Sequence, residues 1–363
     1  MYVFWLALAY LPIYLTDVGL SKFQVSLLIS LLSFAPIFLT LPFGLFSDIL
    51  SPKKLVILGL GLSILFFLGL RYTADFWLLF LLFLLGGIGS SLFLIANPTL
   101  FYKFLGEEHR ATKLGFFHGF RLLGYGLGPL TGGHLLGRGG MSLLFGLALA
   151  LLSLLLLLSF FLEDAEPVKF RLADYRQDVT SKEMAILVAL TFLVSLHLGV
   201  ERTCLSLFLE HNIGLVWTEI GHMFFFIGLG IAGMSVVNGL VEDSASARGR
   251  TLGSFLYLGV LFSGFFNVSL LWTHSFGSVL LVRLAHVLGD SLFLVARATI
   301  IANLFPQERI GGNLGLLQMV LMLGTFVGAL MSGFIPGYLY PFVFAGSVAI
   351  LSLSAVLLAK PRF

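Results

Sequence analysis

The chain has 363 residues, of which 58% are hydrophobic and 11% charged, and its formal net charge is +3. Soluble globular proteins carry about 25% charged residues, so this composition excludes a soluble domain and indicates a protein that faces lipid. The 21 Lys and Arg residues are scattered, which argues against a nucleic-acid partner, and the single cysteine, Cys204, excludes an internal disulfide and a cysteine metal cluster.

Twelve apolar stretches are long enough to cross a bilayer, which takes about 20 residues each. They predict an all-α polytopic membrane protein with helices near residues 1–16, 24–46, 55–71, 76–102, 113–136, 141–162, 184–209, 218–240, 250–272, 276–304, 311–334 and 336–359. Fourteen Lys and Arg residues fall in loops on the side of both termini and three on the other side. By the positive-inside rule we expect both termini in the cytoplasm.

The segment after the second predicted helix reads GLFSDILSPKK from 44 to 54. Through Gly44, Asp48, Lys53 and Lys54 it resembles the loop signature of the major facilitator superfamily, although it lacks that signature's basic residue after the aspartate and its second glycine. Glycine permits close helix approach, and a carboxylate can accept hydrogen bonds from a neighbouring helix N-terminus. We expect a latch that favours the outward-open state; an ordinary polar loop is the alternative.

An internal repeat appears at an offset of 200 residues. SLFLIANPTL at 91–100 matches SLFLVARATI at 291–300 without gaps, and the same offset pairs glycines along the following segments. The repeat predicts two homologous six-helix bundles, residues 1–162 and 184–363, joined by a polar cytoplasmic linker at 163–183. Transporters built from parallel repeats bind substrate between the halves, whereas duplication without transport is the alternative.

The fifth predicted helix carries a regular glycine pattern, in which Pro129 follows the third glycine. The spacing resembles the signature of the superfamily's antiporters, at Gly115, Gly124, Gly128, Pro129, Gly132 and Gly133. Glycines four residues apart form a stripe that lets another helix pack closely, and proline bends a helix. The second half keeps the glycines but has Ala329 where the proline would be. Generic small-residue packing is the alternative to the antiporter interpretation.

The eighth predicted helix ends in a second copy of the loop motif, at an offset of 195 residues. Its members are Gly239, Asp243, Arg248 and Arg250. This second copy favours the latch over an ordinary polar loop.

Charged side chains inside predicted spans are costly, so they are usually paired, in a cavity or functional. The candidates for substrate or proton coupling are Arg121, His118, His197, Glu201, Arg202, Arg283, His286, Asp290, Arg297 and Asn97. Residues seven apart return to nearly the same helix face, so Arg283, Asp290 and Arg297 should share one. Asn97, the repeat counterpart of Arg297, is expected towards the cavity.

Glu201 and Asp290 are the expected proton carriers, because buried carboxylates change protonation when their surroundings change. Structural ion pairs, such as Asp290 with Arg297, are the alternative for any one residue. Arg202 could instead reach the headgroups at the outer end, and His118 could be a packing residue.

The expected function is secondary active transport, with proton-coupled export of a small organic or amphipathic compound by alternating access. The alternatives are a proton symporter or facilitator that imports a polar metabolite, and a non-transporting sensor or assembly factor. We expect no enzyme activity, no metal and no cofactor, since no metal-spaced or catalytic motif is recognised; a proton gradient would supply the energy. The expected setting is the lipid bilayer of a bacterial or archaeal cytoplasmic membrane, with a monomer as the functional unit.

Overall fold

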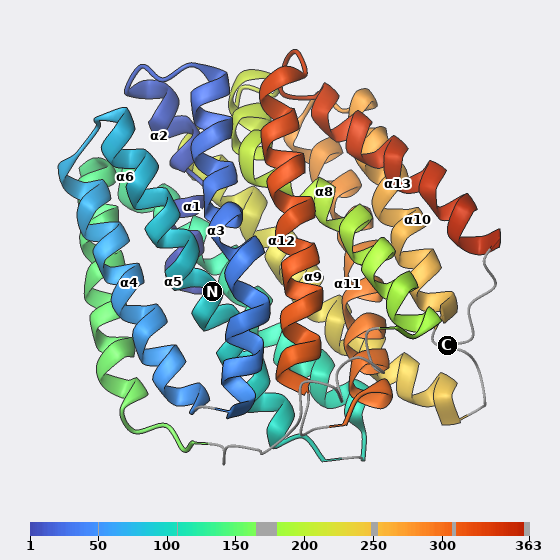
Figure 1. Cartoon of the computed structure of the whole chain (residues 1–363). Helices are drawn as coiled ribbons and strands as arrows, with labels where there is room; N and C mark the ends of the chain where they lie inside the picture. Colours follow the sequence, from blue (N-terminus) through green and yellow to red (C-terminus); the bar gives the residue numbers. More distant parts are fainter. Residues whose placement is uncertain (50, 107, 165–179, 248–252, 307–309, 359–363) are drawn as a thin grey trace.

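The computed structural model describes the chain except for residues 50, 107, 165–179, 248–252, 307–309 and 359–363 (Figure 1). Its helices are α1 Tyr2–Leu8, α2 Leu11–Asp17, α3 Lys22–Ile49, α4 Pro52–Tyr72, α5 Phe76–Lys103, α6 Arg110–Ser159, α8 Lys182–His211, α9 Trp217–Ala247, α10 Gly253–Ser269, η1 Leu270–Trp272, α11 Phe276–Leu304, α12 Ile310–Phe334 and α13 Tyr340–Leu358. No strand occurs in these described ranges. The predicted all-α class is confirmed.

Within the described residues, nine helices are long and apolar enough to cross a membrane, and two shorter apolar helical segments flank them at Tyr2–Asp17 and Tyr340–Leu351. One of the nine, α6, has 50 residues and contains two predicted spans. They are separated at Gly140, where φ is 63° and ψ is −168°, a conformation essentially restricted to glycine. The number of membrane crossings stays a prediction, and most of the predicted linker 163–183 lies outside the described residues.

The first predicted span is not one helix. The regular helical hydrogen-bond pattern is interrupted between α1 and α2, where Tyr10 N donates to Ala7 O three residues back, and Pro12 stands in the first turn of α2. Proline has no amide hydrogen to donate into a preceding turn, so it suits a helix start better than a helix interior. The break leaves Tyr10 fully buried between helices.

The two sequence repeats pack in equivalent ways. A Cβ added to Gly89 on α5 would lie 3.1 Å from the carbonyl oxygen of Gly59 on α4. A Cβ added to Gly289 on α11 would lie 2.7 Å from the carbonyl oxygen of Gly259 on α10. The same close helix contact is therefore made twice, at positions 200 residues apart, in the first and the second half.

Two long helix pairs join the halves: α6 packs against α9, and α3 against α12. Figure 1 shows α3 beside α12 across the front of the bundle. The loops after α3 and α5 lie at the lower end of this view, and the helix ends beside them carry Lys53, Lys54, Lys103 and Arg110. We call this end the basic end, and the positive-inside rule predicts that it is cytoplasmic.

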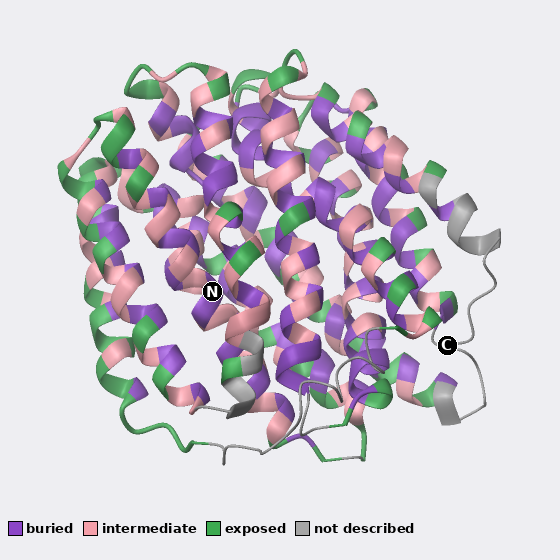
Figure 2. Cartoon of the chain, viewed as in Figure 1, coloured by how far each residue is buried: buried purple, intermediate pink, exposed green. Residues whose placement is uncertain are grey.

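Exposed residues lie mainly on the outer faces of the helices and at the ends, and buried ones inside (Figure 2). Many of the exposed side chains are large and apolar, including Trp77, Leu157 and Leu281. In water such a surface would favour association, whereas the bilayer interior accommodates it. The outer surface therefore suits an integral membrane protein.

Candidate functional site

A cavity of about 250 Å³ lies between the two halves, and it is the place where most of the intramembrane charges meet. Helices α5 and α6 of the first half and α8, α9, α11 and α12 of the second half contribute side chains to its wall. Its polar groups are surrounded by apolar ones such as Trp5, Leu198 and Phe293. Central cavities of this kind are where transporters with repeated halves bind their substrates.

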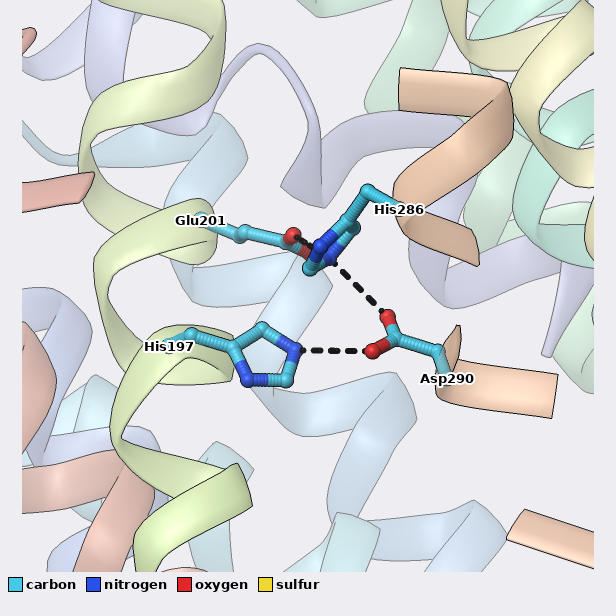
Figure 3. A group of neighbouring side chains, drawn as sticks. All are labelled: His197, Glu201, His286 and Asp290. Carbon is cyan, nitrogen blue, oxygen red and sulfur yellow. Dashed lines mark hydrogen bonds and ion pairs between the residues drawn. The ribbon is translucent and has the colours of Figure 1, made fainter. Parts of the chain in front are cut away.

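Four side chains on α8 and α11 form the core of a polar network (Figure 3). His197 and Glu201 are four residues apart on α8, and His286 and Asp290 are four apart on α11, so each pair shares a helix face. His286 Nε2 lies 3.0 Å from Glu201 Oε1 and 3.1 Å from Asp290 Oδ2. His197 Nε2 lies 3.4 Å from Asp290 Oδ1.

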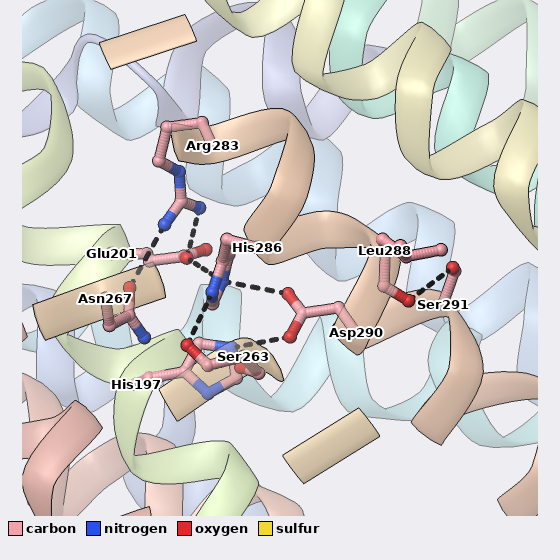
Figure 4. Close-up of polar contacts among 9 residues, drawn as sticks. All are labelled: His197, Glu201, Ser263, Asn267, Arg283, His286, Leu288, Asp290 and Ser291. Carbon is pink, nitrogen blue, oxygen red and sulfur yellow. Dashed lines mark hydrogen bonds and ion pairs between the residues drawn. The ribbon is translucent and has the colours of Figure 1, made fainter. Parts of the chain in front are cut away.

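Arg283 on α11 and two residues of α10 support the network (Figure 4). Arg283 forms an ion pair through Nη2 with Glu201, and its Nη1 donates to Asn267 Oδ1 on α10 at 3.2 Å. His286 Nδ1 lies 2.9 Å from the carbonyl oxygen of Ser263, also on α10. Because a carbonyl oxygen can only accept, this ring nitrogen must donate. These contacts fix the orientation of the imidazole and of the Glu201 carboxylate.

The contacts of His286 define where a proton must lie. With its Nδ1 donating, a neutral imidazole would point the Nε2 lone pair at two carboxylate oxygens. Three lone-pair-bearing atoms at this separation repel each other unless a hydrogen lies between them. At least one proton must therefore be shared among His286, Glu201 and Asp290. Together with Arg283, this proton balances the two carboxylate charges.

Burial makes this charge balance important. The exposed fraction of the side chain is 0% for His286, 1% for Arg283, 3% for His197, 9% for Glu201 and 12% for Asp290. Buried charges are tolerated when they are paired and hydrogen-bonded, and removing one partner is strongly destabilising. Loss of a proton here would leave a buried carboxylate with less compensation for its charge.

The expectation that no metal-spaced cluster exists needs a correction. One ligand atom from each of His197, Glu201, His286 and Asp290 lies within 4.8 Å of the others, and these donor types suit a divalent ion such as Zn²⁺. The sequence hid the cluster because its two halves are 85 residues or more apart on different helices. The Arg283 cation beside Glu201, and the hydrogen-bond distances around His286 Nε2, favour a proton over a metal ion at this position.

Three other candidates line the same cavity, namely His118 and Arg121 on α6 and Arg297 on α11. Among the described residues, no hydrogen-bond partner is found for His118 Nε2, Arg121 Nε, or Nε and Nη1 of Arg297. The ion pair between Asp290 and Arg297, the alternative to proton coupling, is not formed, because Asp290 contacts the two histidines instead.

Arg202 takes the cavity position expected of it, whereas Asn97 does not. Arg202 lines the central cavity and donates to Ser33 Oγ at 3.4 Å, so it does not reach out to the headgroups. Asn97 lines a separate groove beside α5 and α6, which it shares with Arg121, and not the central cavity.

The first copy of the loop motif is partly helical. Gly44 and Asp48 belong to α3, which continues to Ile49, so the predicted loop begins later than expected; their side chains lie outside the description. Lys53 and Lys54 stand in the first turn of α4, and Lys53 Nζ donates to the carbonyl oxygen of Phe160 at 2.7 Å.

The second copy forms a contact between the halves. Asp243 on α9 accepts hydrogen bonds from Ala111 N at 3.2 Å, Thr112 N at 3.0 Å and Thr112 Oγ1 at 2.6 Å. These are the first amides of α6, whose own N-cap, His109, makes no side-chain cap. We call this contact the Asp243 cap. The remaining members, Arg248 and Arg250, lie outside the described residues.

The glycines of the span-five motif serve two interfaces. Gly124, Gly128 and Gly132 face α1: a Cβ added to Gly128 would lie 2.6 Å from the carbonyl oxygen of Tyr2. Gly115 and Gly133 face α9, and a Cβ added to Gly115 would lie 3.4 Å from Gly239 Cα. The two predicted motifs therefore meet at the crossing of α6 and α9.

Pro129 contributes through its carbonyl oxygen, which accepts a hydrogen bond from the Tyr10 hydroxyl at 2.7 Å. That hydroxyl is also 3.2 Å from the carbonyl oxygen of Trp217, at the start of α9. Sequence reasoning missed Tyr10, Ser263 and Asn267. A signal existed for Ser263, since Ser63 occupies the equivalent position 200 residues earlier.

Comparison with known proteins decides the family. The family model described as Major Facilitator Superfamily matches residues 1–269. The chain belongs to the major facilitator superfamily. A protein of Methanocaldococcus jannaschii described as an uncharacterized MFS-type transporter is 24% identical over 347 residues, which is 90% of this chain and 85% of the relative. The chain is thus a membrane transporter.

The fold of the superfamily is seen directly in a solved structure. The human organic anion transporter MFSD10 (TETRAN) is similar, with a TM-score of 0.75 over 98% of this chain and 95% of that one. Its sequence identity is 17%, so the likeness concerns the fold. The two proteins therefore share one fold over nearly their whole length.

Proposed function

We propose that this transporter exchanges protons for a small organic or amphipathic compound by alternating access, and that it works as an exporter. The observation that carries the proposal is the contact of His286 Nε2 with both Glu201 and Asp290 in a cavity between the halves, which calls for a shared proton. The other charged or titratable side chains that line this cavity are His118, Arg121, His197, Arg202, Arg283 and Arg297, with Tyr125 from α6.

Loss of the shared proton provides the coupling step. It leaves Glu201 and Asp290 charged on either side of a neutral imidazole whose Nε2 lone pair faces both. Repulsion among these groups favours separation of α8 from α11, and proton binding favours their approach. A cavity that opens alternately to each side lets the proton enter from the outside and leave on the inside. Substrate then moves in the opposite direction.

The export direction is supported by the motif on α6. Its glycines and Pro129 resemble the signature of the superfamily's antiporters, and in the structure they lie at contacts with α1 and α9. Movement of α9 against α6 would change both ends of the cavity. Symport of a polar metabolite would use the same proton site, so the two directions are separated by experiment.

The test uses purified protein in liposomes with a trapped pH dye and a clamped membrane potential. The probe is anilinonaphthalene sulfonate, whose sulfonate stays ionised, so a pH gradient alone does not redistribute it. Antiport predicts accumulation in an acidic lumen, whereas symport predicts accumulation in an alkaline one. Glu201→Gln and Asp290→Asn should reduce gradient-driven accumulation at least about tenfold, as removal of a proton-transfer group does.

Glu108→Gln is the matched control, because Glu108 is an exposed acid outside the cavity. Variants are compared only where their size-exclusion profiles match that of the parent protein. Full gradient-driven accumulation by both Glu201→Gln and Asp290→Asn would contradict proton coupling at this site.

A further inference from the structure

The cavity carries more positive than negative charge. Its lining includes four arginines, at 121, 202, 283 and 297, and two carboxylates, Glu201 and Asp290, within the part of the chain that the structure describes. Both carboxylates already belong to the histidine network, and Arg283 pairs with one of them. Three arginines therefore remain beyond that network, and one of them, Arg202, donates to Ser33 Oγ.

The excess is concentrated in Arg121 and Arg297. Arg121 comes from α6 in the first half and Arg297 from α11 in the second, and neither has a carboxylate partner among the described residues. Three of their guanidinium nitrogens are buried without a hydrogen-bond partner, as is His118 Nε2 one turn before Arg121. The aromatic ring of Phe117 lies 5.3 Å from the Arg121 guanidinium, and that of Phe293 lies 5.9 Å from Arg297.

Cations without a carboxylate partner are costly away from water, so a structure that keeps two partly buried ones in a cavity normally uses them for a ligand. Guanidinium groups bind planar carboxylates, sulfonates and phosphates through paired hydrogen bonds. We propose that Arg121 and Arg297 bind the negatively charged group of the transported compound. The inference rests on the proposed transport function, for which it names the substrate class as a small organic anion with an apolar body.

The apolar body of such a compound finds its place in the same cavity. Trp5, Leu94, Tyr125 and Leu294 line the same space as the arginines, and the volume of about 250 Å³ suits a small aromatic compound. Arg297 lies seven residues after Asp290 on α11, which is about 10 Å along the helix axis. Anion and proton therefore bind to separate parts of one cavity.

The placement of the arginines gives the anion a second role. Because Arg121 and Arg297 belong to different halves, their like charges repel and oppose closure of the cavity. An anion between them removes the repulsion and links the halves. The protein should accordingly close around an anionic substrate and resist closing without one.

Two compounds that differ by one charged group provide the test. Anilinonaphthalene sulfonate and phenylnaphthylamine share their ring system, but only the first carries a sulfonate. Binding to the protein in lipid nanodiscs is measured by titration calorimetry, with empty nanodiscs as the blank. We expect the sulfonate to bind at least tenfold more tightly than the neutral compound. Arg121→Gln and Arg297→Gln should each weaken sulfonate binding about tenfold and leave the neutral compound unaffected.

Arg138→Gln is the matched control, because Arg138 is exposed and lies on α6 like Arg121. It should bind both compounds as the parent protein does, and Arg121→Lys should retain part of the sulfonate preference. The apparent melting temperature of the ligand-free protein separates binding from a structural role. If each arginine serves ligand binding, Arg121→Gln and Arg297→Gln should leave this melting temperature unchanged or raise it. If the arginine stabilises the fold, the same substitution should lower it.

Equal binding of the two compounds, or parent-like sulfonate binding by both glutamine variants, overturns the inference. These outcomes are independent of proton coupling. If the sulfonate binds through the arginines but a pH gradient does not drive its movement, the proposed function fails and the anion site stands. If the gradient drives transport that ignores Arg121 and Arg297, the function stands and the anion site fails.

Discussion

At the scale of single residues, the ion pair between Arg283 and Glu201 can be tested for its contribution to the stability of the protein. Both side chains are almost fully buried, and each is the other's only partner of opposite full charge among the described contacts. Breaking a buried pair by removing one partner costs about 3–5 kcal/mol, because the remaining charge is left uncompensated. We expect Arg283→Gln to lower stability by this order, measured as a fall in apparent melting temperature in detergent.

The double variant Arg283→Gln with Glu201→Gln should be more stable than the sum of the single effects predicts, since it leaves neither charge alone. If the effects of the two single substitutions on stability simply add in this double-mutant cycle, the interaction between Arg283 and Glu201 does not stabilise the protein. The same cycle with Arg138→Gln and Glu108→Gln, both exposed, should show no coupling.

Sequence reasoning identified all five charged or imidazole groups of this network but could not pair them. The cost of burial marks such residues in any apolar span. Their partners depend on how α8 and α11 approach, and that approach is set by the packing of every helix around them. The alternative ion pair of Asp290 with Arg297 does not form, because residues seven apart are about 10 Å apart along a helix, whereas His286 is one turn from Asp290.

At the scale of elements, the crossing of α6 and α9 depends on glycine. A Cβ added to Gly126 would lie 3.0 Å from Gly228 Cα, and one added to Gly228 would overlap the backbone of Gly126. We expect Gly228→Ala to destabilise the protein by about 1–3 kcal/mol, as overpacking does. Thermal unfolding in detergent measures the effect.

Gly233 provides the control on the same helix, because a Cβ there meets no atom within 4 Å. Gly233→Ala should leave the melting temperature unchanged or raise it slightly, since alanine favours the helix. If Gly228→Ala and Gly233→Ala lower the melting temperature equally, helix propensity and general packing explain the loss of stability, and the close crossing of α6 and α9 does not.

The Asp243 cap concerns the basic end of the same helix pair. Asp243→Asn should weaken the hydrogen bonds to the first turn of α6, at a cost of about 0.5–2 kcal/mol. If these hydrogen bonds keep the cavity closed at the basic end, the fraction of Asp243→Asn molecules that are open at that end rises roughly two- to thirty-fold. The measurement introduces a cysteine into the cavity by Gln318→Cys, in a Cys204→Ser background that has no other cysteine. An impermeant maleimide is added on the side of the basic end, and its rate of reaction with this cysteine is recorded.

Glu108→Gln neutralises an exposed acid near the start of α6 and serves as the control. It should leave the labelling rate unchanged. An unchanged rate in Asp243→Asn as well would remove the cap from any account of gating.

At the scale of the whole molecule, the halves touch at both ends of the cavity. At the basic end the Asp243 cap is joined by Arg110 Nη1, which donates to the carbonyl oxygen of Ala302 at 2.8 Å. At the opposite end Lys22 Nζ donates to the carbonyl oxygens of Ile335 and Gly337, at 2.5 and 2.7 Å. Alternating access would require these two sets of contacts to break one at a time.

The architecture was largely predictable at this scale, because apolar length and a 200-residue repeat are properties of the chain itself. The break between α1 and α2 was not predicted, since hydropathy does not register the loss of a single helical turn at Tyr10. The motif glycines were found from their spacing, but the spacing could not show that three face α1 and two face α9. That division depends on which helices lie on either side of α6.

The Asp243 cap also has a consequence for biosynthesis. Thr112 precedes Asp243 by 131 residues, so the ribosome delivers the start of α6 long before the side chain that satisfies its amides. Until α9 is inserted, those amides must be hydrated or held by lipid headgroups. The first half thus reaches its final hydrogen bonding only after the second half has docked, and a chain that stops short of α9 leaves that helix end incomplete.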